Sequence, residues 1–403
     1  MQRKLDLRGG QPVWKSYRAP SVPAQKLTQD AKTDVLIAGM GISGAMIADA
    51  LAAQGHDVLM IDRRGPLLGS TSATTALVQY EIDTPLSHLI GKIGKQNAER
   101  AWRRSRLAVA NLQSHIEQAD LRCRMTSRPS LYLAGNVLGA GALQEEAVTR
   151  RAAGLGAHYL APADLRESFG IIRRGAILSG NNLALDPRML TSGLLLRSMQ
   201  KKARLYSPVE AMKIEHSADG VSVSTKNGPI IRAKHLVLAT GYELMDGVPA
   251  KGHSVISTWA IATRAQPRNI WPQEALIWEA SDPYLYARAT YDGRIICGGE
   301  DEPFTDEETR DALIEKKSAR IAQKLGKLFP DIDPTPEFKW AGAFGTTESG
   351  LPKIGQIPRK PRIFAVMGYG GNGITFSRIA SELIASTLDG KTDIDADLFA
   401  LTA

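Results

Sequence analysis

Three glycines and one acid have the types and spacing of a dinucleotide-binding site. Gly39, Gly41 and Gly44 match the pattern GxGxxG. In that pattern the first glycine makes a tight turn, the second lets the backbone approach a pyrophosphate, and the third allows close helix–strand packing. Asp62 lies further along, where a carboxylate can accept hydrogen bonds from ribose hydroxyls. Taken alone, the pattern also fits a Rossmann-like turn that binds nothing.

The segments that flank these residues predict a βαβ unit that would position them. Residues 34–38 are apolar and rich in branched side chains, which is typical of a buried parallel strand. Residues 42–54 carry apolar side chains at helical spacing, and Gly55 ends that helix. Residues 58–61 form the next predicted strand, which ends at Asp62. The helix N-terminus would then face the pyrophosphate.

Two later segments predict glycine-rich backbone at the same edge of the sheet. Ala239, Thr240 and Gly241 end one predicted strand, and the turn 371–373 follows another. In a doubly wound sheet the carboxyl ends of the strands line the ligand crevice. The first motif does not distinguish NAD from FAD. Together with the two later segments, however, it makes three places where glycine-rich backbone can lie close to a ligand, and this favours a long, extended cofactor, FAD. The helix that opens at 373 would stabilise negative charge on a reduced flavin. Turns in an ordinary α/β sheet are the alternative.

The composition limits the classes of protein and partner. The 403 residues are 43% hydrophobic, enough for one large domain or two. Only two cysteines occur and the chain start has no apolar signal core, so we expect a reducing, cytoplasmic location and no disulfide framework. No segment predicts a membrane span, and the seven histidines show no metal spacing. The net charge of +8 suggests an acidic substrate, an anionic membrane surface or RNA. No basic run carries interleaved aromatics, so nucleic acid is not the expected partner.

The order of the predicted elements indicates a discontinuous nucleotide domain. Residues 1–30 read as an extended arm, which Trp14 and Tyr17 would pin to the body. We assign 31–90, 145–250 and 335–403 to the FAD-binding domain, and 91–144 and 251–334 to a substrate-binding domain. Helices are expected at 95–118, 306–329 and 374–388, and a strongly β-rich stretch at 251–300. The expected fold class is α/β, with a Rossmann-like domain and a second, β-rich domain.

With these motifs in hand, the chain resembles the D-amino-acid-oxidase superfamily of FAD-dependent amine oxidoreductases. The resemblance runs from about residue 34 to residue 388 and is carried by the order and spacing of "GMGISG…MID", "GSTSATTA", "LATG", "YLYARATYDGRIICGG", "GLPKIG" and "GYGGNGITFS". It implies an antiparallel sheet whose face covers the isoalloxazine ring. It also implies oxidation of a C–N bond, with hydride transfer from the carbon beside a neutral amine to flavin N5 to give an imine.

The resemblance also implies the residues of the site, although no catalytic residue is assigned. The residues expected to bind FAD are Gly39, Gly41, Ile42, Ser43, Gly44, Asp62, Arg63, Ser70, Thr71, Ser72, Thr74, Thr75, Val209, Ala239, Thr240, Gly241, Gly371, Asn372, Gly373, Ile374 and Thr375. The residues expected to line the substrate pocket are Tyr284, Tyr286, Arg288, Phe344, Thr346 and Tyr369. By period-two alternation the two tyrosines and Arg288 share one face of a strand, where they line the pocket or pair across the sheet.

Departures from the family pattern concern the substrate and the flavin linkage. Phe344 and Gly371 stand where relatives carry arginines that pair with a substrate carboxylate. We therefore expect an amine without a free α-carboxylate, such as a secondary amine or a polyamine conjugate. No Cys lies in 340–347 and no His in 69–76, where relatives attach flavin covalently, so we expect non-covalent FAD.

Several alternatives stay open at this stage. Relatives carry an oxygen-activating lysine in the strand matching 294–299, and this chain has none there, so the electron acceptor is oxygen, a quinone or a partner protein. An amino-acid oxidase or dehydrogenase is therefore one alternative, a non-catalytic flavoprotein is another, and an RNA-modifying protein on the same fold is a distant third. Cys297 reads as a small core residue. The oligomeric state is not predicted.

Overall fold

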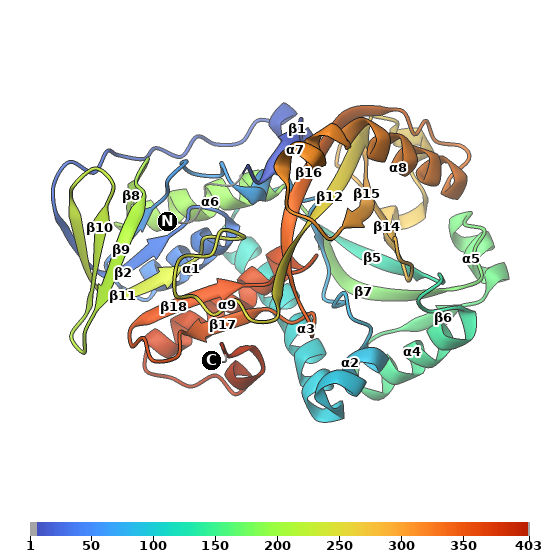
Figure 1. Ribbon diagram of the computed structural model, residues 1–403. Helices are drawn as coiled ribbons and strands as arrows, with labels where there is room; N and C mark the ends of the chain where they lie inside the picture. Colours follow the sequence, from blue (N-terminus) through green and yellow to red (C-terminus); the bar gives the residue numbers. More distant parts are fainter. Residues whose placement is uncertain (1–5, 402–403) are drawn as a thin grey trace.

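The computed structural model describes residues 6–401 and shows two β-sheets side by side (Figure 1). Within these residues one sheet has eight strands and the other has ten. The α/β fold class with a second, β-rich body is confirmed. No helix of the described part combines the length and the apolar character needed to cross a membrane.

The eight-stranded sheet is built on parallel strands whose carboxyl ends meet at one edge. Its order is β17 (Lys353–Gln356), β18 (Ile363–Met367), β11 (Ile230–Leu238), β2 (Ala31–Ala38), β3 (Val58–Ile61) and β8 (Arg204–Tyr206). Along this path each pair of neighbours is parallel except β17 and β18, which run antiparallel to one another. Val35 and Ile37 of β2 enter one core, and Leu36 and Ala38 enter another, because side chains alternate across a strand. Burial on both faces explains the unbroken apolar run over residues 35–38 at the end of β2.

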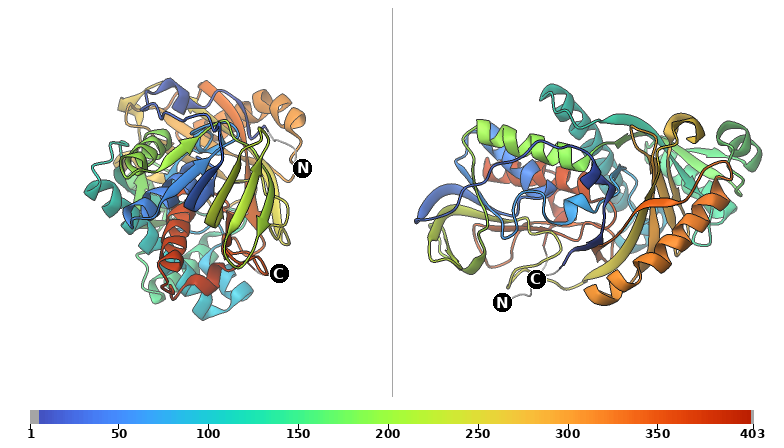
Figure 2. Two further views of the ribbon diagram at one scale, coloured as in Figure 1. Left: turned by 90° about the vertical axis from the view of Figure 1, so that its left-hand side faces the viewer. Right: turned by 90° about the horizontal axis from the view of Figure 1, so that it is seen from above.

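Helices cover one face of this sheet and a β-hairpin covers the other (Figure 2). The helices α1 (Ile42–Ala53), α6 (Pro187–Gln200) and α9 (Gly373–Leu388) form the helical layer, with α1 packed on both others. Asp186 caps α6 by accepting hydrogen bonds from the backbone N–H groups of Arg188 and Met189. The hairpin consists of β9 (Ala211–His216) and β10 (Val221–Thr225), the two further strands of the sheet. The strand β10 pairs antiparallel with β11, and β9 pairs antiparallel with β10.

The ten-stranded sheet is mostly antiparallel, as the resemblance implied. Its order is β1 (Arg8–Gly10), β16 (Pro336–Thr347), β12 (His253–Thr263), β15 (Ile295–Glu302), β14 (Leu285–Ala289), β13 (Leu276–Glu279), β5 (Thr126–Leu133), β7 (Ala176–Ala184) and β4 (Leu77–Val78), with β6 (His158–Leu160) beside β7. The helix α8 (Ile314–Leu328) packs on β12, β15 and β16. Cys297 belongs to the core beneath α8 and is fully buried, which confirms it as a core residue.

The remaining helices connect the two bodies or flank the ten-stranded sheet. They are α2 (Leu86–Ile93), α3 (Lys95–Gln118), α4 (Ala140–Ala152), α5 (Pro162–Phe169) and α7 (Glu307–Ala312). The helix predicted over 306–329 is divided at Leu313, which ends α7 and begins α8. The long helix α3 packs against α9. Since α9 covers the eight-stranded sheet, this contact joins α3 to the body built on that sheet, which is called the nucleotide body below.

Strand pairing divides the chain differently from the expected domain boundaries. Residues 158–184 and 336–347 were assigned to the FAD-binding domain, but their strands β6, β7 and β16 pair within the ten-stranded sheet. The same is true of β4 in the segment 31–90. The sequence shows that these segments are strands, but which sheet each joins depends on long-range register, which local pattern does not encode.

Residues 6–30 of the N-terminal arm are attached to the body, and the roles predicted for Trp14 and Tyr17 are confirmed. Residues 1–5 of the predicted arm lie outside the described part of the chain. The side chains of Trp14 and Tyr17 are both buried. The Trp14 indole N–H donates to the carbonyl of Thr74 at 2.5 Å, and the Tyr17 hydroxyl donates to Asp292 at 2.7 Å. The arm also supplies β1, which pairs with β16.

The turn between β2 and α1 carries Gly39 and Gly41 and packs against Gly44; it is called the glycine turn below and leads to a prediction about stability. A Cβ atom on Gly44 would lie 2.0 Å from the carbonyl oxygen of Gly39, so Gly44→Ala must push α1 away from the turn. We expect the free energy of unfolding to fall by about 1–3 kcal/mol, as for other overpacked cores. Urea denaturation followed by circular dichroism measures the change. Gly141→Ala is the control, because nothing lies within 4 Å of its Cβ position in α4. Equal stability of the two variants would contradict the prediction.

Candidate active site

A cavity of about 540 Å³ extends from the carboxyl ends of the parallel strands to the ten-stranded sheet. Most residues expected to bind FAD line it, although they come from segments far apart in the sequence. They are Gly39, Gly41, Ile42, Ser43, Asp62, Arg63, Ser70, Thr71, Thr74, Thr75, Val209, Ala239, Thr240, Gly241, Gly371, Asn372, Gly373 and Ile374. The fold thus brings the three glycine-rich approaches to one cavity.

The glycine turn is shaped by its contact with the neighbouring strand. Gly39 has a φ of +118°, and a Cβ atom there would lie 2.2 Å from the carbonyl oxygen of Ala239. Both the backbone conformation and the lack of space therefore require glycine. This contact holds the end of β2 directly against the end of β11.

Asp62 has a structural role that the sequence did not indicate. Its Oδ2 accepts a hydrogen bond from the backbone N–H of Met40 at 2.9 Å. Its Oδ1 accepts from Arg64 at 2.7 Å and from Gly65 at 2.9 Å. The carboxylate thus ties the glycine turn to the loop after β3, and it also lines the cavity. A carboxylate has about four acceptor positions, so one is left for a ribose hydroxyl.

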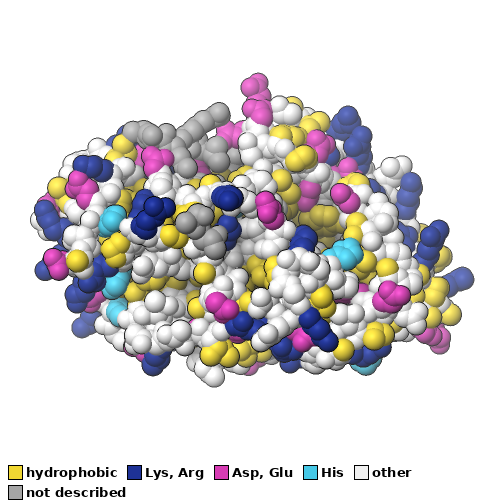
Figure 3. Space-filling view, turned by 60° about the horizontal axis from the view of Figure 1, so that its bottom comes forward, with side chains coloured by type: hydrophobic (Ala, Val, Ile, Leu, Met, Phe, Trp, Pro, Cys, Tyr) yellow, Lys and Arg dark blue, Asp and Glu magenta, His cyan; other side chains and the backbone are white. Residues whose placement is uncertain are grey.

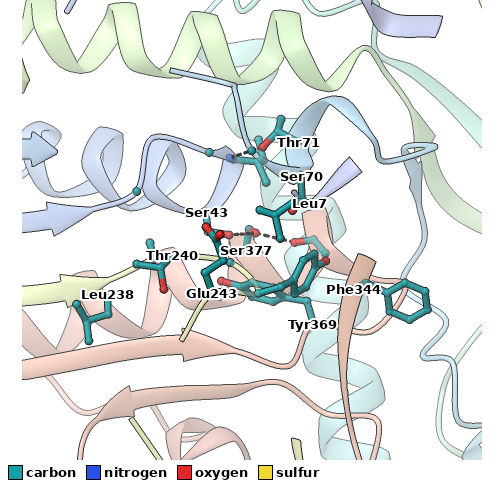
Figure 4. A pocket seen from close by; sticks show the side chains of 18 of the residues that line it. Leu7, Ser43, Ser70, Thr71, Leu238, Thr240, Glu243, Phe344, Tyr369 and Ser377 are labelled. Carbon is teal, nitrogen blue, oxygen red and sulfur yellow. Dashed lines mark hydrogen bonds between the residues drawn. The ribbon is translucent and has the colours of Figure 1, made fainter. Parts of the chain in front are cut away.

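Two helix N-termini meet at this cavity and are linked by their side chains. Ser43 of α1 and Ser377 of α9 point toward one another, with 2.8 Å between their hydroxyl oxygens (Figure 4). The hydroxyl of Thr71 accepts a hydrogen bond from the backbone N–H of Ile42 at 3.0 Å. Partial positive charge at both helix ends favours an anionic group in the cavity between them.

Three residues expected to bind FAD lie behind the cavity wall. Gly44 packs against the glycine turn, and Ser72 is buried in a short 3₁₀ turn. The hydroxyl of Thr375 donates to the carbonyl of Gln79 at 2.7 Å. Asn372 does line the cavity, and its amide donates to the carbonyls of Gln79 and Glu81 at 3.2 and 2.9 Å. These contacts attach the start of α9 to the segment 79–81.

The end of the cavity near β3 is rich in charged side chains. Arg64 forms a two-pronged ion pair with Glu243, with distances of 2.5 and 2.6 Å. The hydrogen bond to Glu243 raises the pKa of Arg64, so the guanidinium stays charged. Arg63 pairs with Glu243 and, at 3.6 Å, with Glu210. Lys213 also lines this end.

The opposite end of the cavity is aromatic. Tyr284, Tyr286, Phe344 and Tyr369 line it, as the resemblance implied, and Figure 4 shows Phe344 and Tyr369. The Tyr284 hydroxyl donates to Asp301 Oδ2 at 2.7 Å. Burial raises the pKa of Asp301 to about 6 and raises the pKa values of Tyr284 and Tyr286 above their usual range. The phenols are therefore neutral hydrogen-bonding groups.

Two residues expected in the substrate pocket do not line the cavity. The Arg288 guanidinium donates to the carbonyls of Ala76 and Leu185 at 2.7 and 3.0 Å and lies over the Trp14 ring. Its position along β14 takes it past the end of the cavity, although it shares a face with the tyrosines. Thr346 forms a hydrogen bond with Ser254 at 2.9 Å on the exposed edge of the sheet. Both expectations are corrected.

Several residues that line the cavity were not identified from the sequence. At the aromatic end these are Gln79, Asp83, Tyr242, Thr258 and Trp278. Tyr242 directly follows the Ala-Thr-Gly turn, so its position beside the motif is a usable signal. The other four have no motif, because only long-range packing brings their segments to the cavity.

The cavity fits an extended dinucleotide such as FAD. Ser70 Oγ and Asn372 Oδ1 are buried, and neither has a hydrogen-bond partner within residues 6–401. Such groups cost free energy when left unpaired, so a polar ligand would satisfy them. The residues that would hold FAD are those of the glycine turn, the loop 70–75 and the start of α9.

Comparisons with known proteins agree with this geometry. The family model for DAO, described as FAD dependent oxidoreductase, matches residues 34–387. Gamma-glutamylputrescine oxidoreductase of Escherichia coli K12 is 24% identical over 94% of this chain and 89% of its own length. The MnmC protein of tRNA 5-methylaminomethyl-2-thiouridine biosynthesis from Cupriavidus necator is 23% identical, over 96% of this chain and 62% of its own length.

A solved structure shows the same fold. The crystal structure of glycine oxidase from Geobacillus kaustophilus superposes with a TM-score of 0.76 and 21% identity, covering 92% of this chain and 99% of that one. Because the family match runs from within β2 to near the end of α9, it includes every cavity-lining residue except Leu7. This chain belongs to the DAO family of FAD-dependent oxidoreductases.

Proposed function

We propose that this oxidoreductase binds FAD non-covalently and oxidises the C–N bond of an amine that lacks a free α-carboxylate, such as a secondary amine or a polyamine conjugate. The family acts on amines or amino acids. One observation carries the narrower proposal. Among the described residues, the aromatic end of the cavity is lined by no lysine or arginine.

The physical argument concerns the carboxylate of an amino acid. Phe344 lines the cavity, and Arg288 is fully engaged elsewhere. An amino-acid substrate would place its carboxylate among aromatic rings without a paired cation. An unpaired buried charge costs several kcal/mol, whereas a neutral amine with an alkyl chain gains from the same surroundings.

The residues of the chain bind and orient the reactants. FAD supplies the acceptor for the hydride that leaves the carbon beside the amine, and the product is an imine. The N-terminus of α9 lies where partial positive charge stabilises an anionic cofactor group. Tyr284 is held in place by Asp301, and Tyr286 and Trp278 exclude water from the aromatic end. The amine binds in its neutral form, so this proposal assigns no side chain as a strong base.

A tRNA-modifying role is the second candidate, because the MnmC proteins are among the relatives. The surface in Figure 3 gives it little support. Lys and Arg side chains are scattered on that face and alternate with acids, whereas a nucleic-acid site usually forms a continuous basic band. Titration of tRNA over a salt series separates the two candidates, since phosphate contacts make affinity fall steeply with salt.

The central prediction concerns substrate choice. N-ethylmethylamine and sarcosine differ mainly in a methyl group and a carboxylate. We expect kcat/KM for the amine to exceed that for sarcosine by about a hundredfold or more, because each 1.4 kcal/mol is a factor of ten. Anaerobic bleaching of the flavin measures the rates without assuming an electron acceptor. Phe344→Arg should narrow the ratio by pairing the carboxylate, and Phe344→Leu should leave it large. Faster oxidation of sarcosine by the wild type would refute the proposal.

A second prediction concerns the cofactor linkage. Acid denaturation of the yellow holoenzyme should release FAD into the supernatant. Both cysteines are buried in hydrophobic cores, Cys123 in the nucleotide body and Cys297 beneath α8, so neither can reach a flavin. His216 lines the cavity from β9 in the nucleotide body, away from the aromatic end. Flavin that precipitates with the protein would contradict non-covalent binding.

A third prediction concerns Asp62. Asp62→Ala removes the acceptor of three backbone N–H groups and of the expected ribose contact. We expect FAD affinity to fall by about 1–3 kcal/mol, roughly 5- to 150-fold in Kd. The free energy of unfolding of the apoprotein should fall as well, because the glycine turn loses its tie. Fluorescence titration and urea denaturation measure the two effects, with the exposed Asp219→Ala as the control. Unchanged FAD affinity would show that Asp62 has no part in cofactor binding.

A further inference from the structure

Asp83 is a carboxylate directed into the aromatic end of the cavity and fixed by backbone. It lies between β4 and α2, lines the cavity and exposes its side chain there. Its Oδ2 accepts a hydrogen bond from the backbone N–H of Gly371 at 2.7 Å. Cβ atoms on Gly370 and Gly371 would lie 2.6 and 3.0 Å from the carboxylate oxygens. The two glycines therefore leave the space that Asp83 occupies.

The charge of Asp83 has no compensating cation within the described residues. It forms no ion pair there, and the Gly371 N–H is its single described donor. The groups whose pKa values its charge raises are Asp301, Tyr132, Tyr242 and Tyr284, and each is an acid. The protein that surrounds the cavity desolvates this carboxylate and raises the pKa of Asp83, although the side chain is accessible from the cavity. A carboxylate in such a place gains most from a cationic ligand, since a carboxylate has acceptor positions beyond the one used.

The two ends of the cavity differ in charge in a way that matches two kinds of ligand group. The basic lining residues come from the parallel-sheet body and are Arg63, Arg64, Lys213 and Lys360. The strand β9, which carries Lys213, lies at the left of Figure 1. Asp83 lies at the end that also holds Tyr284, which directly precedes β14 of the ten-stranded sheet. Cofactor phosphates suit the first end, and a positively charged group suits the second.

We infer that Asp83 is the specificity-determining residue that pairs with a second, protonated nitrogen of the substrate, so that the preferred substrates are diamines or polyamine derivatives. This inference rests on the proposed oxidation of an amine. The nitrogen beside the oxidised carbon binds neutral, and the distal ammonium forms a charge-assisted hydrogen bond with the Asp83 carboxylate.

The test compares two amines of equal length. N-methyl-1,4-diaminobutane and N-methylpentylamine differ only in a terminal ammonium group against a methyl group. Their affinities for the holoenzyme are measured by calorimetry after dithionite reduction of the flavin, so that no turnover occurs. Their kcat/KM values are measured with the oxidised enzyme. The first variant, Asp83→Asn, removes the charge. The second, Gly371→Ala, adds a Cβ atom that displaces the Asp83 carboxylate. The control is Asp219→Asn on the exposed turn between β9 and β10.

We expect the wild type and Asp219→Asn to prefer the diamine by about tenfold or more in both measurements. In Asp83→Asn the ratio should fall to about one, and in Gly371→Ala it should fall partway. A wild-type ratio near one, or a ratio unchanged in Asp83→Asn, would overturn the inference. An equal loss for both amines leaves the ratio unchanged and would assign Asp83 to the reacting nitrogen instead. Preferential binding without oxidation of either amine would support the role of Asp83 and refute the proposed function.

Discussion

The cavity depends on one close contact, between the turn after β2 and the end of β11. Gly39 adopts a positive φ and lies against the Ala239 carbonyl, so the two strand ends stay together. Asp62 then ties the turn to the loop after β3 through the backbone of Met40 and Arg64. These contacts align the N-terminus of α1 with the cavity, and the link between Ser43 and Ser377 brings α9 to the same place. Any residue larger than glycine at 39 would separate the elements that define the site.

The two sheets contribute different chemistry to one continuous space. The parallel sheet supplies helix N-termini, glycine backbone and arginines, which suit phosphate groups. The ten-stranded sheet supplies rigid aromatic side chains, with Tyr284 fixed by Asp301. A hydride acceptor must meet its donor in a place from which water is excluded, and an aromatic wall provides that condition. The junction of the two sheets is therefore where the reaction would take place.

Charged residues near the cavity have separate roles that their types alone do not indicate. Arg288 is buried, and burial lowers its pKa to about 10, yet it serves the fold by binding two carbonyls. Asp62 combines a structural role with a place in the cavity wall. Asp83 has almost no partners and faces the cavity, which makes it available to a ligand. Whether a charged side chain serves the fold or the site is therefore decided by the groups that it contacts, and not by its residue type.

The sequence by itself determined the elements and motifs that depend on local patterns. The βαβ unit, the helices α3 and α9, and the three glycine-rich segments at the cavity could all be predicted, because apolar periodicity and turn glycines are encoded within short segments. Tertiary structure alone decided which sheet receives β7 and β16, that Arg288 lies beyond the cavity, and that Asp83 lies against Gly371. These features arise from contacts between distant segments, where register and packing, not local propensity, set the outcome.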